Sequence, residues 1–244
     1  MQWRDEGLVL GGRRFGESGL ILDVLTATRG RQSGLVYGGA SRRKRPQYET
    51  GNTLQLAWTG RLEEQLGRFE VAELQTSRAA HYLDSPLALA AIAGITALLR
   101  GAVDEGDMAG SALYQPTALV LDSLGEPDIW PALYARWELG LLSALGFGLD
   151  LDVCALSGAN DGLTHVSPKT GRAVQGSEAG EYVDRLLVLP TFLIDGQVAP
   201  SAEDVRDGLA LTGHFLASRL FSAVHRGLPV ERGRLVEKLM KITP

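Results

Sequence analysis

The sequence is poor in the residues that hold metals or form disulfide bonds. Of its 244 residues, one is cysteine and four are histidine. The single Cys154 excludes an internal disulfide, and it excludes a zinc site made only of cysteines within one chain. The histidines never stand four residues apart, as a helical metal site requires. The composition therefore predicts a protein of a reducing compartment, with no metal and no cofactor.

Long apolar runs are also missing. The longest, Pro86 to Leu99, is too short to cross a bilayer and predicts a buried helix. The first six residues lack the apolar stretch of a secretory signal. The sequence thus predicts a cytoplasmic protein that does not enter a membrane.

Enzyme signatures are weak. The glycines lack dinucleotide-binding spacing, and no phosphate-binding loop of the nucleotide hydrolases is present. Ser41 and Lys44 match Ser-x-x-Lys, but Lys44 lies among like charges rather than buried on a helix. Asp150, Asp152 and Cys154 form an incomplete ligand set, which favours a solvated turn over a metal site. No nucleophile is paired with a base, so we expect no enzymatic activity.

Positive charge is scarce overall but concentrated near one end. The chain has 24 Lys and Arg against 29 Asp and Glu, a formal net charge of −5. Residues 1–80 nevertheless carry 12 cations and 9 anions. Four consecutive cations, Arg42 to Arg45, directly follow a glycine-containing turn. Such a cluster attracts phosphate backbones, although a solvated loop between strands would look similar.

Short apolar runs bounded by glycine or charged turns fill the first 76 residues and predict strands. They are Gly7–Leu10, Leu20–Thr26, Gly34–Tyr37, Leu54–Trp58 and Phe69–Leu74. Five strands in this length suit a small closed barrel of the OB type. An SH3-like barrel needs a similar number of residues, so the pattern leaves both open.

Beyond Ser77 the pattern changes to helix. Ser85 and Pro86 are typical of a helix start and predict a helix over Leu87–Arg100. Further helices are expected over Tyr114–Leu124, over Ile129–Leu145, from Ser201 to about His225, and from Pro229 onward. Residues 150–180 are rich in turns. We expect a barrel domain over 1–78 and a helical domain over 79–244.

Cations and aromatic residues alternate along the expected barrel. Phe15, Tyr37, Trp58 and Phe69 are interleaved with arginines at strand ends and turns, as in barrels that bind single-stranded nucleic acid. Phe69 alternates with Val71 and is expected in the core, whereas Tyr37 is a candidate for base stacking. The predicted nucleic-acid contacts of this domain are Arg13, Arg14, Arg31, Tyr37, Arg42, Arg43, Lys44 and Arg45.

Three blocks of the sequence resemble the RecO family of bacterial recombination mediators. The first runs from Glu6 to Arg42 and includes Arg14-Phe15-Gly16-Glu17-Ser18 and Gly38-Gly39-Ala40-Ser41-Arg42. The second is Glu138-Leu139-Gly140-Leu141-Leu142 leading into Gly146-Phe147-Gly148, and the third is Val166 to Val174. They follow one another in the family's order and span most of the chain.

The resemblance implies an OB-fold domain followed by a helical domain and a non-enzymatic role in DNA repair. Such proteins bind single- and double-stranded DNA and anneal complementary strands in the cytoplasm, at the nucleoid. With RecR and RecF they load RecA onto strands coated by single-stranded DNA-binding protein. They contact the acidic, apolar-ended tail of that coating protein.

Four residues of the second domain are further candidates. Lys169 and Arg172, in the Ser-Pro-Lys-Thr-Gly-Arg turn, could extend the DNA contact, although a structural turn would look the same. Arg100 and Arg136 are the only Lys or Arg residues between 81 and 168. They are therefore candidates to bind the acidic tail, the alternative being solvated helix ends.

One departure from the family concerns zinc, which some members bind through four cysteines after the Gly-Phe-Gly turn. Cys154 can align with the first ligand, but Ser157 stands where the second would be. We therefore expect no zinc and a segment ordered by hydrogen bonds and packing. Two other functions stay open on the residues alone: an RNA-binding OB-fold protein, and an adaptor that binds only protein.

Overall fold

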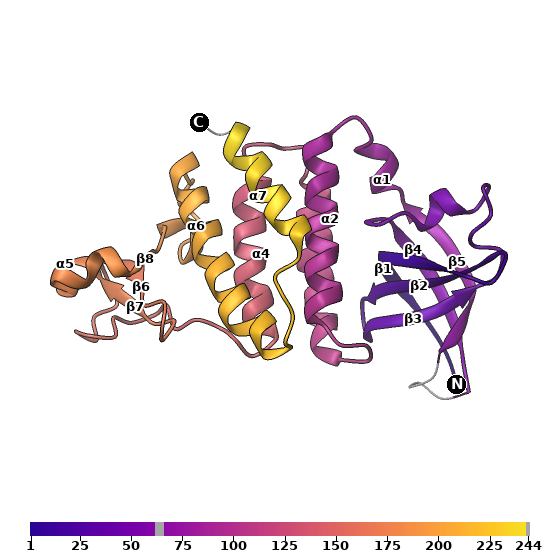
Figure 1. The fold of residues 1–244 in the computed structure, drawn as a ribbon, viewed down its shortest axis with the longest axis horizontal. Helices are drawn as coiled ribbons and strands as arrows, with labels where there is room; N and C mark the ends of the chain where they lie inside the picture. The colour runs from indigo at the N-terminus through magenta and orange to yellow at the C-terminus, as the bar shows by residue number, and fades with distance from the viewer. Residues whose placement is uncertain (62–65, 243–244) are drawn as a thin grey trace. The chain divides into compact units, whose positions relative to one another are not determined.

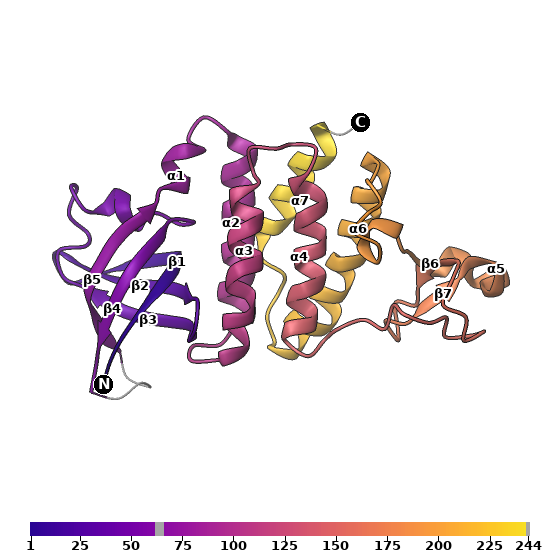
Figure 2. The same cartoon turned by 180° about the vertical axis from the view of Figure 1, so that it is seen from behind.

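The structure is a computed structural model that describes residues 1–61 and 66–242 (Figures 1 and 2). By their contacts, these residues form two compact units. The first unit contains Met1–Gly125 and Pro229–Leu235, and the second contains Glu126–Leu228 and the described part of Val236–Pro244.

The first unit begins with a closed β-barrel (Figure 1). In the described residues its strands follow one another around the barrel in the order β1-β2-β3-β5-β4. Their bounds are β1 Gln2–Phe15, β2 Gly19–Thr26, β3 Gly30–Val36, β4 Thr53–Thr59 and β5 Gly67–Thr76. Antiparallel pairing of β1 with β4 and parallel pairing of β3 with β5 close the barrel. This is an OB-fold, so the predicted fold is confirmed over the SH3-like alternative.

Strand β1 is much longer than the predicted Gly7–Leu10 because it serves two neighbours. Its first half, Gln2–Leu8, pairs with β4, and its second half, Gly7–Phe15, pairs with β2. The register with β2 shifts between Val9 and Gly11, which marks a β-bulge. Both ends of β1 carry exposed charged residues, so the apolar pattern is visible only in the middle.

An aromatic cluster fills one end of the barrel core. Trp3 stacks on Trp58 with ring centroids 5.5 Å apart, and Phe69 meets Trp3 edge-on at 6.1 Å. All three side chains are buried. The inward orientation predicted for Phe69 is therefore confirmed, and Trp58 is unavailable for stacking on a ligand.

Helices of the first unit follow the barrel. They are α1 Arg78–His81, α2 Pro86–Ala102, the 3₁₀ segment η2 Met108–Leu113, and α3 Tyr114–Asp122. Ser85 caps α2 by accepting a hydrogen bond from the Ala88 N–H at 3.3 Å, as its sequence predicted. Helix α2 lies against β1. Helices α1 to α3 belong to the same compact unit as the barrel, so this unit extends beyond residue 78. The domain boundary at residue 78 therefore stays a prediction.

The second unit is mainly helical. Helices α4 and α6 pack side by side (Figure 2). The elements are α4 Trp130–Ala144, β6 Leu163–Val166, β7 Ala173–Gln175, α5 Gly176–Ala179, η3 Gly180–Arg185, β8 Leu187–Val188, η4 Thr191–Leu193, α6 Ala202–Phe215 and a π-helix at Leu216–Phe221. The fully buried Glu138 of α4 accepts a hydrogen bond from the Thr212 hydroxyl of α6 at 2.5 Å. This bond gives the family-like segment around Glu138 a structural role.

The turn-rich segment after residue 150 contains a small sheet of order β7-β6-β8 that the sequence did not predict. Its strands are two to four residues long, too short for a period-two pattern. Gln175 organises the turn at Cys154: its N–H donates to the Cys154 thiol at 3.3 Å, and its side chain contacts Ser157 and Asp161. Hydrogen bonds thus connect Cys154 and Ser157 through Gln175.

The last helix, α7, spans Val230–Ile242 and begins where the sequence predicted. Among the helices of the described residues, none combines the length and apolar character needed to cross a bilayer.

Candidate nucleic-acid interface

The pairing of β1, β2 and β3 determines which side chains share a face of the barrel. Gly11 pairs with Asp23 and Asp23 with Ser33; in the next row Arg13 pairs with Ile21. Directly paired residues and residues two apart on a strand lie on the same face. We call this surface the β1–β2–β3 face; its residues are Gly11, Arg13, Phe15, Ile21, Asp23, Ser33 and Leu35.

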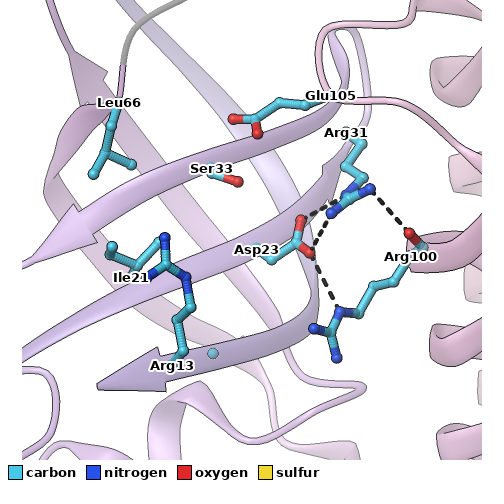
Figure 3. Close-up of a pocket in the computed structure, with 9 residues that line it drawn as sticks. Arg13, Ile21, Asp23, Arg31, Ser33, Leu66, Arg100 and Glu105 are labelled. Atoms are coloured by element: carbon cyan, nitrogen blue, oxygen red, sulfur yellow. Dashed lines mark hydrogen bonds and ion pairs between the residues drawn. The ribbon is translucent and has the colours of Figure 1, made fainter. Parts of the chain in front are cut away.

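One hollow of about 370 Å³ lies on this face, and we call it the arginine hollow (Figure 3). Figure 3 shows Arg31 of β3 and Arg100 of α2 at the carboxylate of Asp23, and Arg13 of β1 beside Ile21. Its lining residues are Gly12, Arg13, Ile21, Asp23, Arg31, Ser33, Leu66, Arg100 and Glu105. The hollow therefore contains three guanidinium groups and two carboxylates.

Asp23 holds two of the three arginines. Arg31 Nε and Nη2 donate to its two carboxylate oxygens, both at 2.9 Å, and Arg100 Nε lies 3.4 Å from Oδ2. Arg31 Nη1 also donates to the backbone carbonyls of Arg100 at 3.0 Å and Val103 at 2.8 Å. We call Asp23, Arg31 and Arg100 the Asp23 cluster. It contains two cations for one carboxylate.

Arg31 is a structural cation. Burial opposes its charge, but the hydrogen bonds and charge of Asp23, with help from Glu105 and Asp104, outweigh burial and raise the pKa of Arg31 above its usual range. Its side chain is 19% exposed, and most of its N–H donors already have acceptors. The DNA contact predicted for Arg31 is untested, but few donors are left for it.

Arg100 and Arg13 differ from Arg31 because their donors are available. The Arg100 side chain is 54% exposed, and its guanidinium lies over Gly11, where an added Cβ would come within 3.0 Å of Nη1. Within the described residues, Arg13 is exposed and has no hydrogen bond or ion pair. The hollow therefore presents one anchored and one unpaired guanidinium.

A second hollow of about 380 Å³, the aromatic hollow, adjoins the first at Leu66. Phe15 ends β1 and is 50% exposed; Tyr37 follows β3 and is 66% exposed. Both line this hollow with Leu35, Thr59, Gly60, Leu66, Gly67 and Arg68. Gly67 allows close packing, since a Cβ there would lie 2.2 Å from the Trp58 ring. Exposed aromatic rings beside such a groove can stack on bases.

The cationic loop, Gly38–Arg45, follows Tyr37 directly. The Ala40 N–H donates to the Ser18 carbonyl at 3.0 Å, which fixes this loop beside the turn between β1 and β2. Arg42 to Arg45 are all exposed. Within the described residues, one ion pair involves them, between Arg45 and Glu49 at 3.8 Å. The four cations are thus at the end of the barrel that carries Phe15 and Tyr37.

The other predicted residues lie elsewhere. Arg14 pairs with Leu20, on the opposite side of β1 from Arg13, and is exposed. Lys169 and Arg172 are exposed in the turn between β6 and β7, where Arg172 is 3.2 Å from Asp150. Both belong to the second unit.

Arg136, also in the second unit, is at the edge of an apolar hollow. This hollow has a volume of about 400 Å³, and its lining residues are Arg136, Leu139, Gly140, Ser143, Leu149, Leu151, Asp152, Leu193 and Ile194. The Arg136 Nη1 donates to the Phe192 carbonyl at 3.3 Å. The two candidates for the partner tail thus have different surroundings, since Arg100 lies on the Asp23 cluster in the first unit.

Sequence reasoning missed Asp23 and did not select Phe15. Asp23 stands inside an apolar run, and nothing in that local pattern indicates that its carboxylate contacts two arginines. A pairing of β1 with β2 around the Gly16 turn would have placed Arg13 opposite Ile21. With the further pairing of β2 and β3, it would have placed Phe15 at the end of the barrel where Tyr37 follows β3. Arg100 is 77 residues beyond Asp23, and no local pattern connects them.

Two family models match the chain. The model described as "Recombination protein O N terminal" matches residues 1–78, and "Recombination protein O C terminal" matches residues 83–226. The curated relatives agree with these matches. "DNA repair protein RecO" of Hyphomonas neptunium is 68% identical over 244 residues, covering 100% of this chain and 99% of the relative. The proteins of the same name from Methylorubrum populi and Rhodospirillum centenum are 47% and 45% identical, over 97% and 99% of this chain and 97% and 96% of the relatives.

Proposed function

Because this chain belongs to the RecO family of DNA repair proteins, we propose that it binds single- and double-stranded DNA and anneals complementary strands. The observation that supports this is the combination of exposed aromatic rings, available guanidinium groups and the cationic loop at one end of an OB barrel. OB barrels bind oligonucleotides on the face of their second and third strands, near the loops that flank it.

The proposed mechanism of annealing is electrostatic and needs no catalytic group. Two nucleic-acid strands repel each other through their phosphates, and a cationic surface offsets that repulsion. Phe15 and Tyr37 stack on bases and keep the strand extended. Arg13, Arg14 and the cationic loop bind phosphates, so the pairing edges of the other bases remain open to a second strand.

The second unit supplies the proposed protein contacts. An acidic tail that ends in an apolar residue, such as that of single-stranded DNA-binding protein, suits the hollow at Arg136: leucine and isoleucine side chains surround the apolar end, and the guanidinium binds a carboxylate. We propose that Lys169 and Arg172 add weaker phosphate contacts.

In the cell, we propose that the protein acts at the nucleoid in the cytoplasm. There, together with RecR and RecF, it helps RecA replace single-stranded DNA-binding protein on single strands. This is a mediator role rather than an enzymatic one, and no cofactor takes part in the proposed contacts.

The experiment is annealing of two complementary strands that have been coated with the cognate single-stranded DNA-binding protein. The wild-type protein should accelerate annealing, and Arg136→Gln should slow it on coated strands while leaving naked strands unaffected. Arg206→Gln is a matched control, because Arg206 is another exposed arginine of the second unit. Equal loss on naked and coated strands would show that Arg136 does not act through the tail.

Two alternative functions predict other outcomes. Stronger binding of RNA than of DNA with the same sequence would indicate an RNA-binding protein. Failure to bind any oligonucleotide, even at low salt, would indicate an adaptor for proteins alone. The exposed and unpaired cations of the barrel favour DNA binding over the adaptor.

A further inference from the structure

We propose that the arginine hollow is a specific phosphate-binding site, in which Arg13 and Arg100 together bind one phosphodiester of the DNA strand. This inference rests on the DNA binding proposed above and assigns a ligand to Arg100. It differs from the general attraction of the cationic loop, since it places one phosphate between two defined side chains.

The first argument is the charge of the Asp23 cluster. Two guanidinium groups share one carboxylate in the cluster, and with Arg13 and Glu105 the hollow has three guanidinium groups for two carboxylates, so an excess positive charge remains. Asp23 accepts hydrogen bonds from Arg31 Nε and Nη2 and forms an ion pair with Arg100 Nε at 3.4 Å. The two terminal nitrogens of Arg100 have no acceptor among the described residues. They form a donor pair of the geometry that matches a phosphate.

The second argument is preorganisation. An exposed arginine loses side-chain entropy when it binds, and that loss reduces affinity. Arg100 is already held, because its Nε lies 3.4 Å from Asp23 and its guanidinium rests on Gly11. A phosphate bound there therefore requires little further ordering of this side chain.

The third argument is position. Arg13 and Phe15 are two residues apart on one face of β1, a distance of about 6.8 Å along the strand. The arginine and aromatic hollows meet at Leu66. A strand with one base at Phe15 and Tyr37 can therefore continue into the arginine hollow, which Arg13 and Arg100 both line (Figure 3).

An acidic peptide offers carboxylates to the same donors, but the surroundings favour DNA. Glu105 lines the hollow and Asp23 anchors it, so an acidic chain would bring further carboxylates toward these two. A peptide ending in an apolar residue also needs an apolar pocket, whereas the arginine hollow is lined mainly by charged residues. Continuity with the aromatic hollow adds to the case for a nucleic-acid strand.

The test measures binding of a fluorescent oligothymidine as a function of salt concentration. We compare the wild type with Arg13→Gln, Arg100→Gln and the double variant; Arg4→Gln is the matched control, since Arg4 is exposed on β1 and lines neither hollow. The double variant should bind roughly ten-fold more weakly, and its salt slope should fall by about 0.7, the value for one lost phosphate. The single variants should not be additive, because both side chains bind the same group.

Arg100→Lys separates position from charge. Lysine keeps the positive charge but has no pair of terminal donors to span a phosphate, so we expect weaker binding with little change of the salt slope. Wild-type affinity in Arg100→Lys would overturn the proposed geometry.

Three results would contradict the site. A double variant with unchanged affinity removes it. Additive effects with a slope change of about 1.4 mean two separate phosphates. Loss of binding to an acidic peptide with intact DNA binding assigns the hollow to a protein partner. In each case the proposed function still holds if the wild type binds DNA and this binding depends on the cationic loop. If the wild type binds no DNA, both the phosphate site and the proposed function are wrong.

Discussion

The cationic loop and the Asp23 cluster place arginines in opposite environments. In the loop, Arg42 to Arg45 are exposed, and the ion pair of Arg45 with Glu49 measures 3.8 Å between half-exposed groups. In the cluster, Arg31 and Asp23 are 19% and 13% exposed and are joined by two hydrogen bonds of 2.9 Å. The same residue type therefore acts in two different ways in one barrel.

The two kinds of arginine should act differently on DNA: exposed cations attract it, and hydrogen-bonded cations determine where it binds. Exposed cations act over distances of about 10 Å at 0.1 M salt, and salt screens them. They increase the rate at which a polyanion arrives but fix no geometry. A partly buried, hydrogen-bonded guanidinium is less screened and keeps its direction. Mutations in the cationic loop should therefore change the salt dependence of binding, and mutations in the Asp23 cluster should change stability.

The largest effect is expected from Asp23→Ala, and it concerns stability. The substitution leaves Arg31 largely buried without its carboxylate, a loss that costs about 3–5 kcal/mol in comparable buried pairs. Thermal or urea unfolding measures it. A variant as stable as the wild type would mean that the backbone carbonyls of Arg100 and Val103 are enough to hold Arg31.

The next effect concerns binding without stability. Replacing Arg42, Arg43, Lys44 and Arg45 by alanine should lower the salt slope of single-strand binding by roughly 2 to 3, at about 0.7 per phosphate contact. Unfolding should be unchanged, because these side chains are exposed. If the slope of this folded variant equals that of the wild type, the loop does not contact the strand.

A smaller effect is expected from the aromatic hollow, between the two arginine regions. Phe15→Ala and Tyr37→Ala should each weaken oligothymidine binding by about 1–3 kcal/mol, the usual value of one stacked base. The salt slope should stay constant, since no charge is removed. Leu119→Ala, another exposed apolar residue of the first unit, is the control. Equal losses in the control would indicate a non-specific effect.

The smallest effect is expected from Glu49→Gln. The ion pair with Arg45 is exposed and adds little to stability, so unfolding should not change. Removing one negative charge beside the loop should strengthen DNA binding slightly at low salt. A clear loss of stability would mean that this ion pair orders the loop, as the ion pairs of Asp23 order the Asp23 cluster.

Local sequence patterns predicted most elements of the fold. Apolar runs between glycine turns located the strands, and Ser85 with Pro86 located the start of α2. The full length of β1 was not predictable, because its first end alternates exposed and buried residues and its last four residues are all exposed. The strands β6 to β8 were missed since two to four residues cannot express a period.

The candidate site was only partly predictable. A run of four cations is visible in any sequence, and their exposure agrees with a solvent-facing loop. Whether an arginine is free or paired depends on residues distant in the chain. Arg31 and Arg13 look alike in sequence, but only Arg31 meets Asp23 and the carbonyls of Arg100 and Val103.

The hydrogen bonds from Arg31 to the carbonyls of Arg100 and Val103 would be lost in a truncated protein. A polypeptide ending at residue 78 would retain every strand of the barrel but would lack the acceptors at Arg100 and Val103 and the bridge between Arg31 and Glu105. Its β2–β3 surface would then be solvated where α2 and the segment after it now cover it. Oligonucleotide affinities measured on such a fragment would describe an altered surface, and the intact chain is the proper material for comparing them.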